Sequence, residues 1–320
     1  MLFYFWHRIG LRYRPDFHFR GVGLGAAGKM ASWTFGMLLL TTFAGIVETQ
    51  VVTLAHGEAS VAVLATAWLI FMLPHSVITV SVATAYFTRM SEHATRGNWT
   101  LVKTDASSAI RGTSLVIVLA AAVIAVCAYP FAAVFVAPFD QVQSIGNVIV
   151  AFILGLVPFC VLFVVQRTFY ALGDTRTPFF FTLFQVVLLV CAVVACAWLP
   201  TDWIAVGIAG SITVTGTLQA ILAALLLRRR MRGIDGQRIL RSLVKYLVAV
   251  IIPLAAGLTL LMILGGNVEN GFAVSSRLTA MVSMVLIGMV MAVSYFGLLL
   301  LMRSDELTAF LTPLRARLRR

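Results

Sequence analysis

The stretch Gln166–Pro178, QRTFYALGDTRTP, is a short polar segment between two long apolar runs. The runs, 144–166 and 179–199, are each long enough to cross a bilayer as a helix. A connection this short predicts a tight turn at a membrane face that joins two antiparallel helices. Gly173 suits the end of the first helix. Pro178 suits the first turn of the second helix, where a missing N–H costs nothing.

The composition of the whole chain is that of a polytopic membrane protein. Hydrophobic residues make up 61% and charged residues 11% of the 320 residues, against about 25% charged residues in soluble domains. The mean hydropathy is +0.99. We therefore expect an all-α fold with eight transmembrane helices. The apolar stretches of about 20 residues lie at 30–54, 60–88, 112–136, 144–166, 179–199, 203–227, 242–264 and 278–302.

Basic residues are concentrated in alternate connections between these stretches. Apart from Lys29 and Arg277, the 24 Lys and Arg residues fall in the N-terminal tail, in every second loop or in the C-terminal tail. The other loops, around His56 to Glu58, Asp140, Asp202 and Asn267 to Asn270, contain no Lys or Arg at these positions. By the positive-inside rule, this pattern places both termini in the cytoplasm. The formal net charge of +12 then indicates contact with anionic membrane lipids rather than with nucleic acid.

Cysteine, histidine and carboxylate residues show no pattern of a metal site or of an enzyme. The four Cys residues lie inside predicted spans, and no two have the spacing of metal ligands. The five His residues are scattered. Only Asp305 and Glu306 are adjacent among the 12 Asp and Glu residues, whereas a membrane transferase acting on polyprenyl lipids needs clustered carboxylates or a strong base. We expect no metal, no cofactor and no catalytic residue.

Several segments resemble one family of membrane proteins. The string from Arg167 to Pro178 resembles the turn between two transmembrane helices of the MurJ (MviN) family of lipid II flippases. Ala65–Pro74 and Ser81–Ala85 are similar to the second helix of that family's C-terminal lobe. Arg89-Met-Ser91 and the amphipathic piece Asp105–Arg111 are similar to the cytoplasmic segment that follows this helix. The resemblance covers most of the chain and extends more loosely to the last two spans.

The resemblance implies a fold from the multidrug/oligosaccharidyl-lipid/polysaccharide exporter (MOP) superfamily, in the bacterial cytoplasmic (inner) membrane. We expect one MATE-like six-helix lobe followed by two extra helices. The expected domains are a cytoplasmic linker or amphipathic segment (1–29), the six-helix lobe (30–232), the two terminal helices (233–302) and a basic cytoplasmic tail (303–320).

The first residues predict that this chain corresponds to the second half of a longer protein. Met1–Trp6 is an apolar fragment too short for a signal peptide. It leads into a basic linker, Arg12-Tyr-Arg-Pro15, which resembles the linker that closes the first six-helix lobe in the family. We expect the missing N-terminal lobe to be truncated here or encoded as a separate chain.

Ionisable residues and prolines inside spans are the candidates for a substrate path. They are Lys29, Glu48, Pro74 and Pro158, with the alternatives that Lys29 and Glu48 lie at the interfaces and that the prolines only shape packing. Pro253 is a third proline expected to kink a span. The cytoplasmic turn motif consists of Arg167, Tyr170, Gly173, Asp174, Arg176 and Pro178. Trp99 is expected to be an interfacial anchor rather than a platform for a ligand.

The resemblance implies a transporter rather than an enzyme, with lipid II or a similar polyprenyl-diphosphate lipid as its substrate in cell-wall biosynthesis. Alternating access then requires a partner, either the missing lobe or a second copy of the chain. Leu69 departs from the family, because many members have a basic residue there on the substrate path. The alternatives are a non-transporting scaffold, a decayed half-transporter and an exporter of another lipid-linked oligosaccharide.

Overall fold

The computed structural model describes residues 24–56, 58–136, 139–233, 235–266, 268–269, 271–302 and 306–307. Within these residues the chain is helical, with turns between the helices. The expected Arg12–Pro15 linker and most of the expected basic tail lie outside the described residues. The helices are α2 (Leu24–His56), α3 (Glu58–Pro74), the π-helix η1 (His75–Thr79), α4 (Val80–Thr95), α5 (Trp99–Val126), α6 (Ala128–Phe135), α7 (Phe139–Ile153), α8 (Leu156–Ala171), α9 (Arg176–Cys196), α10 (Thr201–Arg230), α11 (Gly236–Ala249), α12 (Ile251–Ile263) and α13 (Arg277–Leu301).

The described residues contain seven helical stretches that are long and apolar enough to cross a membrane. The pair α7 and α8 passes the same test together but is bent by 46°, so the count reaches eight if the pair is one span. Each of these stretches overlaps one of the eight apolar runs predicted from the sequence. The all-helical membrane fold is therefore confirmed, with seven or eight spans.

The boundaries differ from the prediction between Arg89 and Arg111. Most of this segment is helical, because α4 continues to Thr95 and α5 begins at Trp99. Polar residues of this segment have structural roles in the helices. Asn98 caps α5 by accepting a hydrogen bond from the N–H of Leu101 at 3.3 Å. At the N-terminus, α2 begins at Leu24, within the segment 1–29 that was expected to be a linker or an amphipathic segment.

Prolines set the positions at which the long helices break. Pro158 and Pro253 each follow a break, at Gly155 and at Val250, because the proline ring clashes with the carbonyl four residues earlier. The expected kink near Pro158 is confirmed by the 46° bend between α7 and α8, whereas 236–263 remains one candidate span across Val250. At Pro74, α3 instead passes into the π-helix η1, and 60–95 remains one continuous candidate span.

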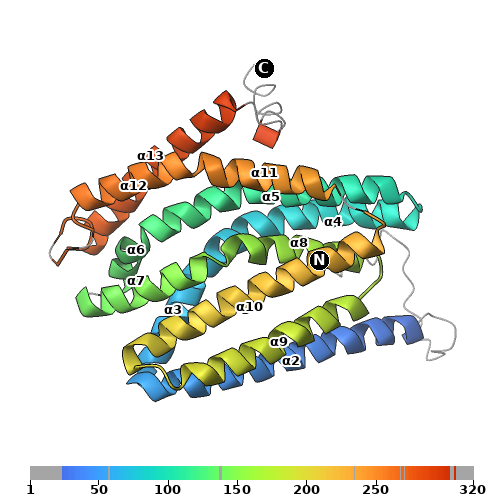
Figure 1. The fold of residues 1–320 in the computed structure, drawn as a ribbon, viewed down its shortest axis with the longest axis horizontal. Coiled ribbons are helices and arrows are strands. Elements are labelled where there is room, and N and C mark those ends of the chain that lie inside the picture. Colours follow the sequence, from blue (N-terminus) through green and yellow to red (C-terminus); the bar gives the residue numbers. More distant parts are fainter. Residues whose placement is uncertain are drawn as a thin grey trace, which may run out of the picture.

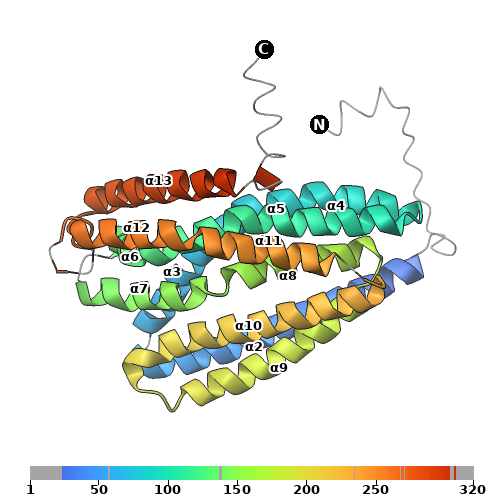
Figure 2. The same cartoon turned by 45° about the horizontal axis from the view of Figure 1, so that its top comes forward.

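The helices form two groups that pack on each other. Helices α2, α9 and α10 pack together as one group, and α10 also contacts α7 and α8 in the other group. The second group contains α3 to α8, and α11 to α13 cover its outer side by packing on α5 and α6 (Figures 1 and 2). The turns that follow α4, α8 and α10 lie together at one end of the molecule, on the right of Figure 1. We call this end the basic end, because it carries Arg96, Arg176 and Arg228 to Arg232.

The terminal helices are attached to α5 by apolar packing and by a buried ion pair. Tyr246, Ile287, Met291 and Tyr295 are fully buried against residues of α5. The hydroxyl of Tyr295 donates to the carbonyl of Leu115 at 3.0 Å. These contacts hold α11 to α13 on the face of α5 that points away from α2, α9 and α10.

Candidate functional site

A groove of about 720 Å³ lies between the two groups of helices. Its walls come from α2 and α3, from α7 and α8, and from α9 and α10. Most of the lining is apolar and aromatic, including Trp68, Phe152 and Phe159. The polar side chains that line it are Thr34, Thr41, Glu48, Thr49, Gln166, Tyr170, Thr182, Gln185 and Gln219. A membrane helix exposes such side chains to a polar path or to another helix rather than to lipid.

Several polar residues of the groove contact one another, either within one helix or between helices. Gln166 donates to the hydroxyl of Tyr170 at 2.9 Å within α8. Gln219 of α10 donates to the hydroxyl of Thr182 of α9 at 3.3 Å. The sulfur of Met37 in α2 lies 4.0 Å from the Gln166 amide and 3.9 Å from the Thr182 hydroxyl. Four helices therefore contribute to one ordered polar wall.

Glu48 is the only charged side chain among the residues that line the groove. It lies on α2 and is half-buried. The lining includes no Lys or Arg. The groove can therefore offer hydrogen bonds and a carboxylate, but its own lining has no cation for an anionic group.

The fourth span, formed by α7 and α8, is bent by 46° and lines the groove with Phe152 before the bend and Phe159 after it. Gly155 lies at the break, where an added Cβ would come within 2.9 Å of the Thr213 hydroxyl and 3.2 Å of the Thr213 Cα. Close packing of α10 therefore requires glycine at this position. The Thr213 hydroxyl donates to the carbonyl of Ala151 at 2.7 Å. That carbonyl lacks its helical donor, because the N–H of Gly155 bonds Phe152 instead, at 2.9 Å.

The turn motif at the basic end connects the groove to the surface. Gly173 has a φ of +70°, a conformation that glycine adopts without strain. Its N–H bonds the carbonyl of Tyr170 at 3.0 Å, and the next N–H, that of Asp174, bonds Phe169 at 3.0 Å. This pair of bonds is a Schellman motif, which closes the C-terminus of α8.

Asp174 then starts the following helix. Its carboxylate accepts from the N–H of Thr177 at 3.0 Å and from the Thr177 hydroxyl at 2.7 Å. A carboxylate at the start of a helix satisfies an unpaired N–H and interacts favourably with the helix dipole. Pro178 is buried in the first turn of α9, where no N–H donor is needed.

The two arginines of the turn motif pack on aromatic rings. The guanidinium of Arg167 lies 4.9 Å from the ring centroid of Phe163 and 5.9 Å from that of Phe87. Arg176 lies 5.6 Å from Phe180 and is also near Trp33 of α2. These stacked arrangements fix both side chains at the ends of the helices. Tyr170 is the motif residue that reaches the groove.

The other candidates for the substrate path do not lie in the groove lining. Lys29 is exposed near the start of α2. Pro74 is buried next to η1, and Pro158 lies in the first turn of α8 behind the bend. Near Pro74, the ring of His75 packs between Phe159 and Phe163, with centroid distances of 4.8 Å to each. The structure thus brings Glu48 and Tyr170 to the groove and separates Lys29 from it.

Sequence reasoning missed the uncharged polar residues of the groove. Gln185 and Gln219 lie inside predicted spans, and an amide in an apolar run is a signal that could have identified them. Among the described residues, no group of three or more His, Cys, Asp or Glu side chains lies close enough to hold a metal ion.

The fold and the groove define a polytopic α-helical membrane protein with a largely apolar groove, containing several polar side chains, between two groups of helices. The family model described as "Lipid II flippase MurJ" matches residues 1–282. The chain therefore belongs to the MurJ family, and the family predicted from the Arg167–Pro178 turn is confirmed.

Two individual proteins show how far the similarity extends. A "Probable lipid II flippase MurJ" from Borreliella burgdorferi is 24% identical over 180 residues, which are 55% of this chain and 35% of that protein. A solved structure described as "Lipid II flippase MurJ, inward closed conformation" gives a TM-score of 0.62 at 15% identity, over 93% of this chain and 60% of that one. This structural likeness shows the fold. The chain spans less than two thirds of the length of either protein.

Proposed function

We propose that this chain forms one wall of the path of a lipid II flippase and works in bacterial cell-wall biosynthesis as a transporter, not as an enzyme. Membership of the MurJ family supports the substrate class. The observation that carries the proposal is the groove itself, because its largely apolar lining includes Glu48 and several glutamine, threonine and tyrosine side chains that a hydrated head can contact.

The physical need for such a surface follows from the substrate. A polyprenyl-diphosphate sugar carries charges and hydroxyl groups that cannot enter hydrocarbon without losing their hydration. Glutamine, threonine and tyrosine side chains in the groove replace part of that hydration by hydrogen bonds. The apolar tail stays in the lipid while the head moves.

We further propose that a second wall supplies the cations. The groove lining has Glu48 but no Lys or Arg, whereas a diphosphate needs cationic or several hydrogen-bonding partners. Leu69, the departure from the family, is exposed on α3 and does not line the groove. The second wall comes from further helices, which belong to an N-terminal lobe, to another chain or to a second copy.

The orientation proposed for this path places the basic end in the cytoplasm. The turns after α4, α8 and α10 carry the arginines of the sequence pattern, which the positive-inside rule assigns to that side. With both termini also cytoplasmic, the chain is a multi-pass protein of the inner membrane.

Reconstitution tests the proposal. The 320-residue chain is placed in liposomes with labelled lipid II, and the appearance of the head group on the opposite leaflet is followed over time. We expect translocation no faster than in empty liposomes, and a clear rise when the first lobe of a family member is added. Rapid translocation by the chain alone, without a crosslinked dimer, contradicts the need for a second wall. No rise with any partner lobe favours a non-transporting scaffold.

A further inference from the structure

Two adjoining hollows lie at the basic end, outside the groove. One, of about 420 Å³, is lined by Trp99, Lys103, Leu172, Arg230, Met231 and Arg232. The other, of about 400 Å³, is lined by Leu225, Arg228, Arg229, Arg232 and Gly233. Arg232 lines both. We propose that these hollows bind the phosphate head group of an anionic phospholipid in the adjacent leaflet.

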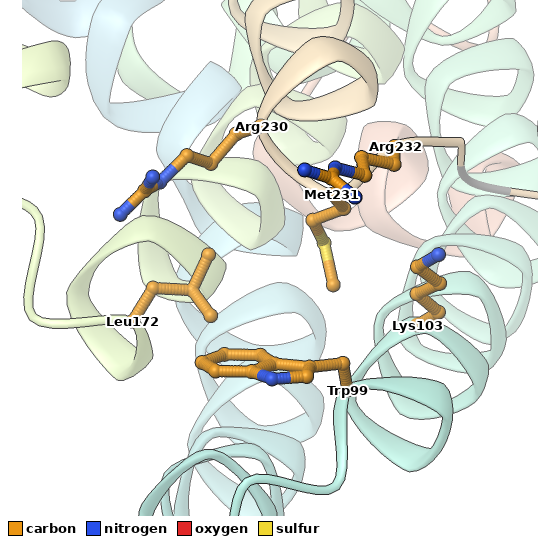
Figure 3. Close-up of a pocket in the computed structure, with 6 residues that line it drawn as sticks. All are labelled: Trp99, Lys103, Leu172, Arg230, Met231 and Arg232. Carbon is orange, nitrogen blue, oxygen red and sulfur yellow. The ribbon is translucent and has the colours of Figure 1, made fainter.

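The first hollow combines an aromatic floor with cations on its rim. In Figure 3 the indole ring of Trp99 lies below, and Arg230 and Arg232 lie on the opposite side. Lys103 stands beside them, on α5 rather than on α10. Trp99 is 54% exposed although it is a large apolar side chain. An amphipathic ring at the level of lipid head groups, with basic residues around it, is the arrangement that favours a lipid phosphate.

The cations of the hollows have no carboxylate partner among the described residues. Elsewhere arginines are paired, since Arg89 contacts Asp105 at 2.8 Å and Arg96 contacts Glu92 at 2.7 Å. No ion pair within the described part of the chain involves Lys103 or any arginine of 228–232. Several unpaired cations close together repel one another, so an anion that binds between them is stabilised.

Arg232, which lines both hollows, has a strained backbone conformation. It has a φ of +50° and is the only residue other than glycine with a positive φ in the described ranges. The N–H of Gly233 bonds Arg228 at 2.9 Å and that of Arg232 bonds Arg229 at 3.3 Å, which is again a Schellman motif. In the motifs that end α4, α8 and α12, the corresponding residue is glycine: Gly97, Gly173 and Gly265. A residue other than glycine that holds such a strained backbone conformation points to a role of its side chain in binding.

The helix dipole accounts for only part of this cluster. Basic residues in the last turn of α10 interact favourably with the C-terminal carbonyls. That explanation covers Arg228 to Arg230. It does not explain Lys103, which comes from another helix, or an arginine rather than glycine at position 232.

The outer face of α10 indicates a lipid rather than a soluble phosphate. Exposed residues follow one stripe along this helix at helical spacing: Val214, Leu218, Ile221, Leu225, Arg228 and, beyond the helix end, Arg232. The stripe passes from apolar to cationic at the hollow. The residues of α10 that line the groove, Ile212, Gly216 and Gln219, lie on the other side of the helix, since two positions correspond to about 200° of rotation. An acyl chain along the stripe brings its phosphate to Arg228 and Arg232.

Native mass spectrometry of the full chain, purified in detergent, measures lipid binding directly. The chain is titrated with phosphatidylglycerol, with zwitterionic phosphatidylcholine and with glycerol 3-phosphate as a soluble phosphate. We expect phosphatidylglycerol to bind most tightly. Lys103→Gln and Arg232→Gly should each weaken its binding about fivefold, the factor that corresponds to about 1 kcal/mol per basic residue.

Matched variants separate a site from general positive charge. Arg241→Gln removes one exposed cation of α11 that lines neither hollow, and we expect it to leave phosphatidylglycerol affinity unchanged. Arg232→Gly should also keep or raise the thermal midpoint, because glycine suits the left-handed position. If that variant does not fold, Lys103→Gln and Arg230→Gln decide the question.

Three results overturn the proposal. Equal binding of phosphatidylglycerol and phosphatidylcholine shows that the hollows do not recognise the negative charge of the head group. Glycerol 3-phosphate that binds as tightly and displaces the lipid assigns the hollows to a soluble phosphate. Equal losses in Lys103→Gln and Arg241→Gln show a diffuse charge effect without a site.

Discussion

Arg111 and Glu306, which are 195 residues apart in the chain, form an ion pair between α5 and the segment that follows α13. The guanidinium is buried, and the same carboxylate oxygen also accepts from the hydroxyl of Ser242 of α11 at 3.3 Å. The Nζ of Lys245 donates to the carbonyl of Met302 at 2.7 Å nearby. Helices α11 to α13 are therefore attached to α5 at one point by an ion pair and elsewhere by apolar packing.

Replacing one partner of this pair should be strongly destabilising. We expect Glu306→Leu to lower the free energy of unfolding by about 3–5 kcal/mol, because Arg111 is left as an unpaired buried charge. Unfolding in mixed micelles of detergent and SDS measures the change. Glu92→Leu is the control, since it breaks an exposed pair with Arg96 and should cost no more than about 0.5 kcal/mol. Equal effects of the two variants contradict the burial argument.

Thr213→Val should destabilise the bend between α7 and α8. The variant keeps the shape of the side chain but leaves the Ala151 carbonyl without its donor, which costs about 1–3 kcal/mol. The thermal midpoint in detergent should fall accordingly. Thr217→Val is the matched control, because its hydroxyl bonds only the Thr213 carbonyl within α10, at 2.7 Å. A similar midpoint for both variants shows that the bend does not depend on this hydrogen bond.

Asp174→Ala should cost about 1 kcal/mol, the typical value of a helix N-cap. Asp174→Asn retains an oxygen that accepts from the Thr177 N–H and should be close to the original chain. Thermal midpoints distinguish the two. If Asp174→Ala keeps its midpoint yet abolishes translocation in a reconstituted two-lobe protein, Asp174 acts on the head group instead of on the turn.

Glu48→Ala should slow translocation by about tenfold or more in a two-lobe reconstitution. A hydrogen bond from a substrate hydroxyl to a carboxylate contributes about 1.5–3 kcal/mol. Lys29→Ala is the control, because Lys29 lies on the same helix but outside the groove lining. Equal translocation rates for Glu48→Ala and the original protein would show that Glu48 does not contact the substrate. A loss confined to Lys29→Ala moves the path toward the start of α2.

Cysteine labelling checks the orientation. In a background without the four native cysteines, Asp140→Cys should react with an impermeant maleimide added outside intact cells, and Thr100→Cys should not. Both positions are exposed, Asp140 at the start of α7 and Thr100 at the start of α5. These two helix starts lie at opposite ends of the molecule in Figure 1. Labelling of Thr100→Cys alone reverses the proposed orientation of the basic end.

The hydropathy pattern was sufficient to identify the membrane helices, and the Gln166–Pro178 turn was sufficient to identify the family. A bilayer requires about 20 apolar residues for each span, so the eight runs could be read without knowledge of packing. The breaks near Pro158 and Pro253 were also predictable, since proline acts on the backbone of its own helix. The turn motif depends on residues close in sequence, so Gly173 and Pro178 could be assigned to a helix end and a helix start.

Contacts between distant helices were decided only by the tertiary structure. The sequence could not show that Gln166, Thr182 and Gln219 share one wall while Lys29 lies outside it, because which face of a helix turns inward depends on its neighbours. Asp105 and Arg111 belong to a piece that the sequence shows only as amphipathic, and they pair with Arg89 and Glu306, which lie on other segments. Lys103 and Arg232 line one hollow for the same reason. Local chemistry follows from the order of residues, whereas a site built from several helices follows from how those helices pack.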